Sequence, residues 1–87
     1  MEPNVKKTKR VKLWFVAGEE PKIVVFEPMG TEFPISPGHD LYVELPAEDV
    51  DVVAISIWNN GIGVLLPYPG DNTVLDHDGK VIERLWR

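Results

Sequence analysis

Residues 13–26 read LWFVAGEEPKIVVF, two apolar runs that are separated by a short polar segment at residues 18–21. Runs rich in valine, isoleucine and aromatic residues on either side of glycine and proline are typical of strands joined by a turn. We therefore expect a first hairpin with its loop at residues 18–21. In the register that follows, Phe15 lies opposite Val24.

Both faces of this expected hairpin are apolar. A strand with one solvated face should alternate apolar and polar residues, yet the second face here carries Trp14, Val16, Ile23 and Val25. An exposed apolar face of this kind usually marks an interaction site. The sequence thus predicts a protein interface on this face. The alternative is that the chain folds back over it, through residues 33–45 or residues 85–86.

A second hairpin is predicted by the dipeptide NG at residues 60–61, the preferred loop of a type I′ turn because both positions need a positive φ. The resulting register sets Ile57 opposite Val64. On the other face it places Trp58 over Gly63, where the missing side chain leaves room for the indole ring. We include Trp58 in the predicted partner interface.

A third hairpin is predicted by the dipeptide DG at residues 78–79, for the same reason. It sets Thr73 opposite Arg84 and Leu75 opposite Ile82, and so forms a half-buried ribbon near the C-terminus.

The density of turn residues predicts an all-β fold. The 87 residues include seven glycines and eight prolines, and no longer window keeps the apolar periodicity of a helix. Only residues 46–50 resemble one helical turn, with proline near the start and acids after it. We expect about six to eight short strands in an antiparallel meander that forms a small barrel or a two-layer sandwich. Residues 1–10 should be a flexible basic leader and residues 11–87 a single β domain.

Charge is unevenly distributed along the chain. Residues 13–87 hold thirteen acidic and four basic residues, although the whole chain has a net charge of only −5. The difference comes from five basic residues near the N-terminus, Lys6, Lys7, Lys9, Arg10 and Lys12. This arm could contact nucleic-acid phosphates or an acidic protein, but the acidic body would repel a polyanion. We favour a solvated tail, and keep nucleic-acid binding as the alternative.

Several kinds of chemistry are excluded by composition. The chain has no cysteine, so disulfides, thiolate metal sites and cysteine nucleophiles are absent. No apolar run reaches the length of about 18 residues that a membrane-spanning helix needs, and the N-terminus does not resemble a signal segment. We expect a cytoplasmic protein without a membrane partner.

Two histidine-containing segments are candidates for reactive sites. Residues 76–79, DHDG, contain two carboxylates and an imidazole but lack the later ligands of a calcium loop. Ser36 and His39 flank a Pro-Gly turn, which does not fix a nucleophile against a base. We expect structural turns at both places, with no metal, cofactor or catalytic residue. A small-ligand or metal site built on His39, Asp40, Asp76 and His77 is the weakest alternative.

The aromatic residues could also form a stacking platform for a nucleic acid or a sugar. Such platforms interleave aromatic with basic residues, whereas the sequence neighbours here are valine, isoleucine and serine. The sequence therefore favours a non-enzymatic protein-interaction or regulatory module. Its partner would be a second copy of the chain or a basic protein, which the acidic body would attract.

Overall fold

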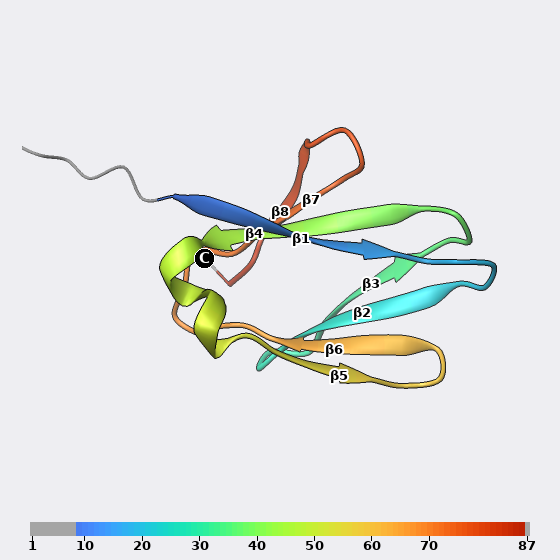
Figure 1. The fold of residues 1–87 in the computed structure, drawn as a ribbon, viewed down its shortest axis with the longest axis horizontal. Helices are drawn as coiled ribbons and strands as arrows, with labels where there is room; N and C mark the ends of the chain where they lie inside the picture. The colour runs from blue at the N-terminus through green and yellow to red at the C-terminus, as the bar shows by residue number, and fades with distance from the viewer. Residues whose placement is uncertain (1–8, 87) are drawn as a thin grey trace, which may run out of the picture.

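The computed structural model describes residues 9–86 and shows two packed four-stranded β-sheets (Figure 1). Sheet I has the strand order β1-β4-β7-β8 and sheet II the order β3-β2-β6-β5. The strands are β1 (Arg10–Val16), β2 (Lys22–Glu27), β3 (Thr31–Ile35), β4 (Asp40–Pro46), β5 (Ala54–Ile57), β6 (Gly61–Leu65), β7 (Thr73–Leu75) and β8 (Val81–Arg84). The all-β fold is confirmed. Of the two architectures left open, the molecule adopts the sandwich, without closing into a barrel. The strands do not follow one another as in the expected antiparallel meander, because both sheets contain neighbours that are not consecutive in the chain, and β2 pairs with β6 in parallel.

One short 3-10 helix, η1 (Ala47–Val52), connects β4 in sheet I with β5 in sheet II. It follows Pro46, whose extended backbone ends β4, and it carries Glu48 and Asp49 in its first turn. The helical turn expected near residues 46–50 is therefore confirmed, and it extends to Val52.

The first predicted hairpin is wrong. β1 pairs with β4, so that Trp14 lies opposite Tyr42, while β2 belongs to the other sheet. Residues 18–21 carry the chain across the sandwich (Figure 1). The physical reason is burial: a hairpin of two apolar runs would leave one face uncovered. In opposing sheets, Phe15 and Val24 both enter the same core.

The corner between β1 and β2 is joined to the corner between β3 and β4 by backbone hydrogen bonds. Ala17 N donates to His39 O at 3.0 Å, and Gly38 N lies within bonding distance of both Ala17 O and Gly18 O. The residues before β4 thus fix the point at which the chain leaves β1.

The predicted register of the second hairpin is also wrong, by two residues. Ile57 lies opposite Ile62, and Trp58 N donates to Gly61 O at 2.8 Å, so the loop is Asn59-Asn60. Neither asparagine has the positive φ of a type I′ turn. Gly61 is instead a strand residue, because β6 also pairs with β2 in parallel at this point.

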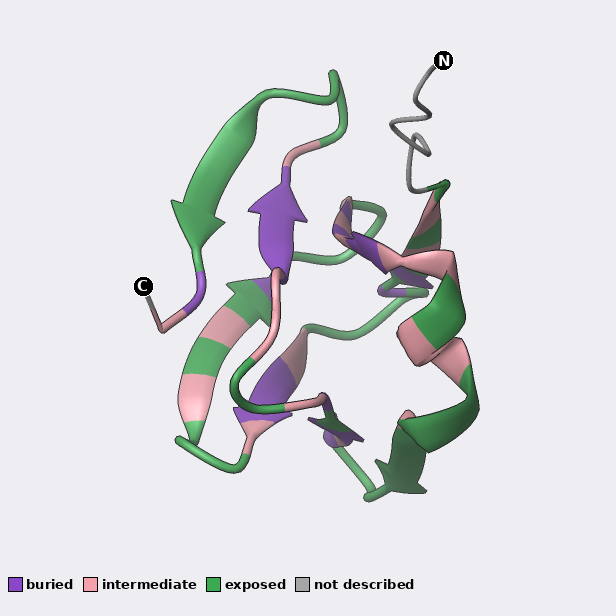
Figure 2. Cartoon of the chain, turned by 90° about the vertical axis from the view of Figure 1, so that its left-hand side faces the viewer, coloured by how far each residue is buried: buried purple, intermediate pink, exposed green. Residues whose placement is uncertain are grey.

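The third predicted hairpin is correct at Thr73, which lies opposite Arg84. An irregularity after Val74 then sets Leu75 opposite Val81, so the expected partner Ile82 is displaced by one position. Gly79 has the predicted positive φ of 84°, but Asp78 does not, so the turn is not of type I′. Asp76 N donates to Lys80 O at 2.9 Å, and the loop therefore has three residues, 77–79. Figure 2 shows β7 as buried and β8 as exposed over its whole length.

The core lies between the sheets and contains fully buried side chains from both, including Val24, Phe26, Val43, Leu45, Val64 and Val74. The ring of Phe26 contacts Phe15 and Phe33 edge to face. Leu85 is also buried, and Trp86 Nε1 donates to Thr31 Oγ1 at 3.1 Å. Residues 85–86 therefore close the β8–β3 side of the core and do not cover Trp14.

Gly61 is required by the close approach of β2 to β6, which gives a prediction for stability. A Cβ at this position would lie 2.7 Å from Ile23 O, a backbone atom that cannot rotate away. We expect Gly61→Ala to lower the free energy of unfolding by about 1–3 kcal/mol, as overpacking does. Chemical denaturation measures this change.

Gly18→Ala is the matched control, because nothing lies within 4 Å of a Cβ at Gly18. Its free energy of unfolding should change by less than about 0.5 kcal/mol. Equal losses in the two variants would show that contact with β2 does not explain the glycine.

Candidate functional site

An aromatic pair dominates the outer side of sheet I. Trp14 in β1 and Tyr42 in β4 are directly paired across the strands, and their rings are nearly parallel, with centroids 6.2 Å apart and an interplanar angle of 13°. The indole nevertheless remains 61% exposed. A large, ordered aromatic surface thus faces solvent at this point of the described structure.

Asp40 fixes the orientation of the indole. Trp14 Nε1 donates to Asp40 Oδ2 at 2.7 Å, and His77 Nδ1 lies 3.1 Å from Asp40 Oδ1 on the other side. The Asp40 side chain is only 10% exposed, whereas that of His77 is 77% exposed. The carboxylate therefore connects β1 to the β7–β8 loop, and it restrains Trp14 as well as His77.

The same contacts alter the protonation of both groups. The hydrogen bond from Trp14 stabilises the charged carboxylate and, with His77, lowers the pKa of Asp40. The hydrogen bond to Asp40 raises the pKa of His77, and the nearby carboxylates of Asp78 and Asp76 act in the same direction. Both shifts widen the pH range in which a negative Asp40 lies beside a positive His77.

The basic residues of the predicted N-terminal arm differ in their contacts with the domain. Lys12 Nζ lies 5.8 Å from the centre of the Tyr42 ring, as in a cation–π contact. Arg10 is engaged within the domain, because Arg10 Nη1 lies 2.8 Å from Asp71 Oδ2 and its Nε 3.6 Å from Glu44 Oε1. Lys9 is exposed. Lys6 and Lys7, with most of the expected leader, lie outside the described residues.

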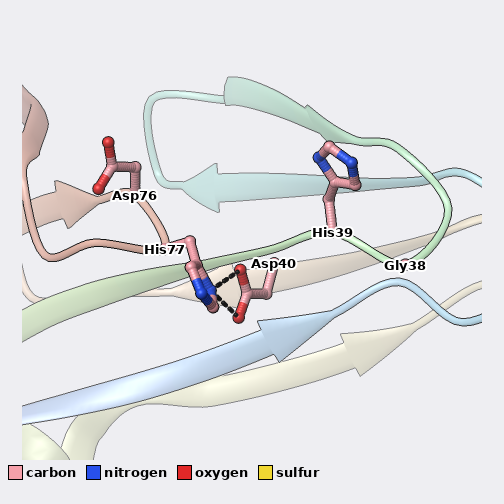
Figure 3. Close-up of a pocket in the computed structure, with 5 residues that line it drawn as sticks. All are labelled: Gly38, His39, Asp40, Asp76 and His77. Atoms are coloured by element: carbon pink, nitrogen blue, oxygen red, sulfur yellow. Dashed lines mark hydrogen bonds and ion pairs between the residues drawn. The ribbon is translucent and has the colours of Figure 1, made fainter.

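A shallow hollow of about 400 Å³ lies beside this site, lined by Gly38, His39, Asp40, Asp76 and His77. The fold therefore brings both histidine-containing segments together, as the weakest of the sequence alternatives requires. Their side chains do not converge, however: Figure 3 shows His39 and the Asp76 carboxylate pointing away from the Asp40–His77 pair.

The two turns that line the hollow are held by their own hydrogen bonds. Asp76 Oδ1 accepts hydrogen bonds from the backbone of Asp78 and Lys80, as in a turn, and His39 N donates to Ser36 O. Within residues 9–86 no cluster of three or more histidine or acidic side chains could hold a metal ion.

The predicted partner interface is divided between two sheets. Trp14 and Val16 lie on the outer side of sheet I and are exposed. Ile23 and Val25 belong to sheet II, where Val25 is buried. Trp58 lies over Gly61 and Gly63 on the outer side of sheet II, which agrees with the predicted contact to Gly63. The five residues therefore do not form one surface, because β1 and β2 do not pair.

Comparison with known proteins gives no relative: no family model, curated protein or solved structure matches the chain. No helix in residues 9–86 is long and apolar enough to cross a membrane.

The partners of Trp14 were missed by the sequence analysis. Tyr42, Asp40 and His77 are distant from Trp14 in the chain. The pairing of β1 with β4 brings Asp40 and Tyr42 to it, and the pairing of β4 with β7 adds His77. A signal was available in residues 40–46, DLYVELP, where Leu41, Val43 and Leu45 alternate with polar residues. This alternation is typical of a strand with one solvated face, and it puts Tyr42 on that face.

The Asp40–His77 contact gives a prediction that NMR titration can check. Asp40→Asn can still accept a hydrogen bond from Trp14 but removes the charge, so the pKa of His77 should fall towards its ordinary value. Asp78→Asn is the control, because its effect on His77 is smaller and purely coulombic. A His77 pKa that Asp40→Asn leaves unchanged would contradict the contact.

The raised pKa of His77 also fixes the direction of a pH effect on stability. Folding favours the protonated imidazole, so this contribution is complete below the ordinary histidine pKa of about 6.5 and is lost as the pH rises through the raised value. The lowered pKa of Asp40 gives the opposite sign: its contribution is complete above the ordinary aspartate pKa of about 3.9 and is lost as the pH falls through the lowered value. Denaturation midpoints of the wild type should therefore fall relative to those of Asp40→Asn as the pH rises from about 6.5 through the raised pKa of His77.

Proposed function

We propose that the domain is a non-enzymatic protein-interaction module whose partner docks on the outer side of sheet I. The docking surface, here called the aromatic face, consists of Lys12, Trp14, Val16 and Tyr42. The observation that supports it best is the state of Trp14, which is held by Asp40 and Tyr42 and is still largely exposed.

A restrained and exposed tryptophan suits binding for an energetic reason. Ordering a side chain at an interface costs about 0.5–1.5 kcal/mol when that side chain is free beforehand. The hydrogen bond to Asp40 and the stacking on Tyr42 have already ordered Trp14 in the free domain. Burial of the indole by a partner is then favourable without most of that cost, and tryptophan is a frequent interface hot spot.

The charge of the domain indicates the kind of partner. Residues 13–87 carry thirteen acidic against four basic residues. A basic protein surface would be attracted at long range, which raises the rate of encounter more than the final affinity. The aromatic face would then supply the short-range contact.

Nucleic-acid binding is the second candidate, and the position of Lys12 favours it. Lys12 precedes Trp14 by two residues in β1 and so lies on the same face of the strand. The fold places its ammonium group over the Tyr42 ring, beside the stacked indole. Aromatic rings with an adjacent cation are the elements of a single-strand binding surface. Arg10 adds little to it, because Asp71 and Glu44 already pair with its charge.

Substitution of Trp14 tests the protein-interaction proposal. A partner isolated with the wild-type domain, then identified and purified, should bind Trp14→Ala about 30-fold more weakly, which corresponds to the loss of a hot spot of about 2 kcal/mol. Met29→Ala is the control, since Met29 is a similarly exposed apolar residue outside sheet I. A purified partner that binds Trp14→Ala and the wild type with the same Kd would refute the proposal.

Salt dependence separates the second candidate from the first. If the aromatic face binds nucleic acid, the affinity for a single-stranded oligonucleotide should fall steeply between low and moderate salt, and Lys12→Ala should reduce the slope by about one. Fluorescence anisotropy measures both quantities. Under the protein-interaction proposal we expect no saturable binding to the oligonucleotide near physiological salt.

A further inference from the structure

A second surface, at the edge of sheet II, is unrelated to the aromatic face. β5 is the last strand of that sheet, and all four of its residues are exposed (Figure 2). We propose that β5 pairs antiparallel with β5 of a second copy of this chain, so that the two copies of sheet II become one continuous sheet.

The apolar residues of β5 face the core but are not covered by it. Ile55 lies opposite the buried Val64 and Ile57 opposite Ile62, so both isoleucines are on the core-facing side of the sheet. They are nevertheless 54% and 81% exposed. No other part of residues 9–86 buries them, and the core is therefore incomplete on this side of the molecule.

The other edge strands carry the residues that natural proteins use against edge-to-edge pairing. β1 contains Arg10 and Lys12, β8 contains Glu83 and Arg84, and β3 contains Glu32 with a proline after Phe33. Charges and prolines at such positions discourage another strand from adding to the sheet. β5, with the sequence AISI, has neither. Among the four edge strands of the described sandwich, it alone is unprotected.

Charge favours a second copy of the chain as the occupant. Two copies with a net charge of −5 each repel one another, so they can associate only where little charge is brought together. Residues 52–70 contain no Asp, Glu, Lys, Arg or His, and this is the longest uncharged segment of the sequence. It includes all of β5 and β6. A basic partner would gain nothing from this surface, whereas a like-charged copy avoids repulsion there.

The residue pattern of β5 is self-complementary. With a two-fold axis at Ser56 and perpendicular to the sheet, antiparallel pairing sets Ile55 of each copy opposite Ile57 of the other. The four isoleucines then lie together on the core-facing side, where each copy covers what the other leaves exposed. Such an isologous contact is the commonest arrangement of homodimers.

Analytical ultracentrifugation of the whole chain tests the proposal. Because the interface is centred on short strands, we expect a reversible dimer of twice the 9.8 kDa chain mass with a Kd on the order of 10–100 μM. Ile57→Lys should be monomeric throughout this range, while Val16→Lys, an exposed apolar residue of β1, should dimerise like the wild type. A wild type that stays monomeric at about 1 mM would overturn the proposal, as would a dimer that Val16→Lys abolishes and Ile57→Lys does not.

A cross-linking experiment tests the register and does not depend on how well Ile57→Lys folds. The chain has no cysteine, so Ser56→Cys introduces a single thiol on the proposed two-fold axis. Directly opposed residues of antiparallel strands are about 4.5–5.5 Å apart at Cα, a distance that a disulfide spans. Mild oxidation should convert Ser56→Cys into a covalent dimer, and Glu83→Cys on the protected edge strand β8 should not react comparably. Equal cross-linking of both variants would overturn the assigned contact.

Discussion

The structure depends on one crossing, at which the chain leaves sheet I after β1 and enters sheet II as β2. The backbone of Ala17 and Gly18 is bonded there to the corner that precedes β4, through His39 and Gly38. Two consecutive apolar strands are thereby placed on opposite sides of one core, and each buries a single face in it. The remaining face of β1 must point outward, and this is why Trp14 and Val16 are exposed beside Tyr42.

One tryptophan lies on the outer side of each sheet, and the residues that contact each ring determine its role. Trp58 lies over Gly61 and Gly63, where a side chain would collide with its ring, so it acts as a cover for an otherwise bare part of sheet II. Trp14 has Tyr42 opposite it and Asp40 at its N–H group. Its ring is held by these two partners instead of lying over glycines, and it remains 61% exposed, free to contact another molecule.

The sequence predicted those features that depend on local chemistry. The dipeptide at residues 78–79 marks the place of a turn, and Gly79 has the positive φ that the turn needs. Counting from the observed turn would set Thr73 opposite Glu83, and only the irregularity after Val74 restores the predicted partner Arg84. The β1–β4 pairing could not be found in this way, because no turn joins these strands and many pairings would satisfy the same apolar runs. The dipeptide at residues 60–61 was misleading for a related reason: Gly61 is needed where β2 approaches β6, so tertiary contact and not turn preference determines its backbone. Of the candidate site, Trp14 was identified from its own strand. Asp40 and His77 were named only for a small-ligand or metal site, and their contact with Trp14, like that of Tyr42, depends on the pairing of β1 with β4 and of β4 with β7.

The aromatic face and the β5 edge of sheet II offer different chemical groups, and therefore suit different partners. Around Trp14, side chains are already paired: Asp40 with His77, Lys12 with Tyr42, and Arg10 with Asp71. A partner that docks there finds an ordered surface whose polar groups need little rearrangement, so specificity comes from the shape and charge of side chains. At β5 the available groups are the backbone of an uncharged edge and two isoleucines. Backbone pairing is indifferent to side-chain identity, so discrimination at that edge must come from register and repulsion. The chain is acidic and its other edge strands carry charged residues, so repulsion disfavours association there. The uncharged edge at β5 is the place where a like-charged copy can approach.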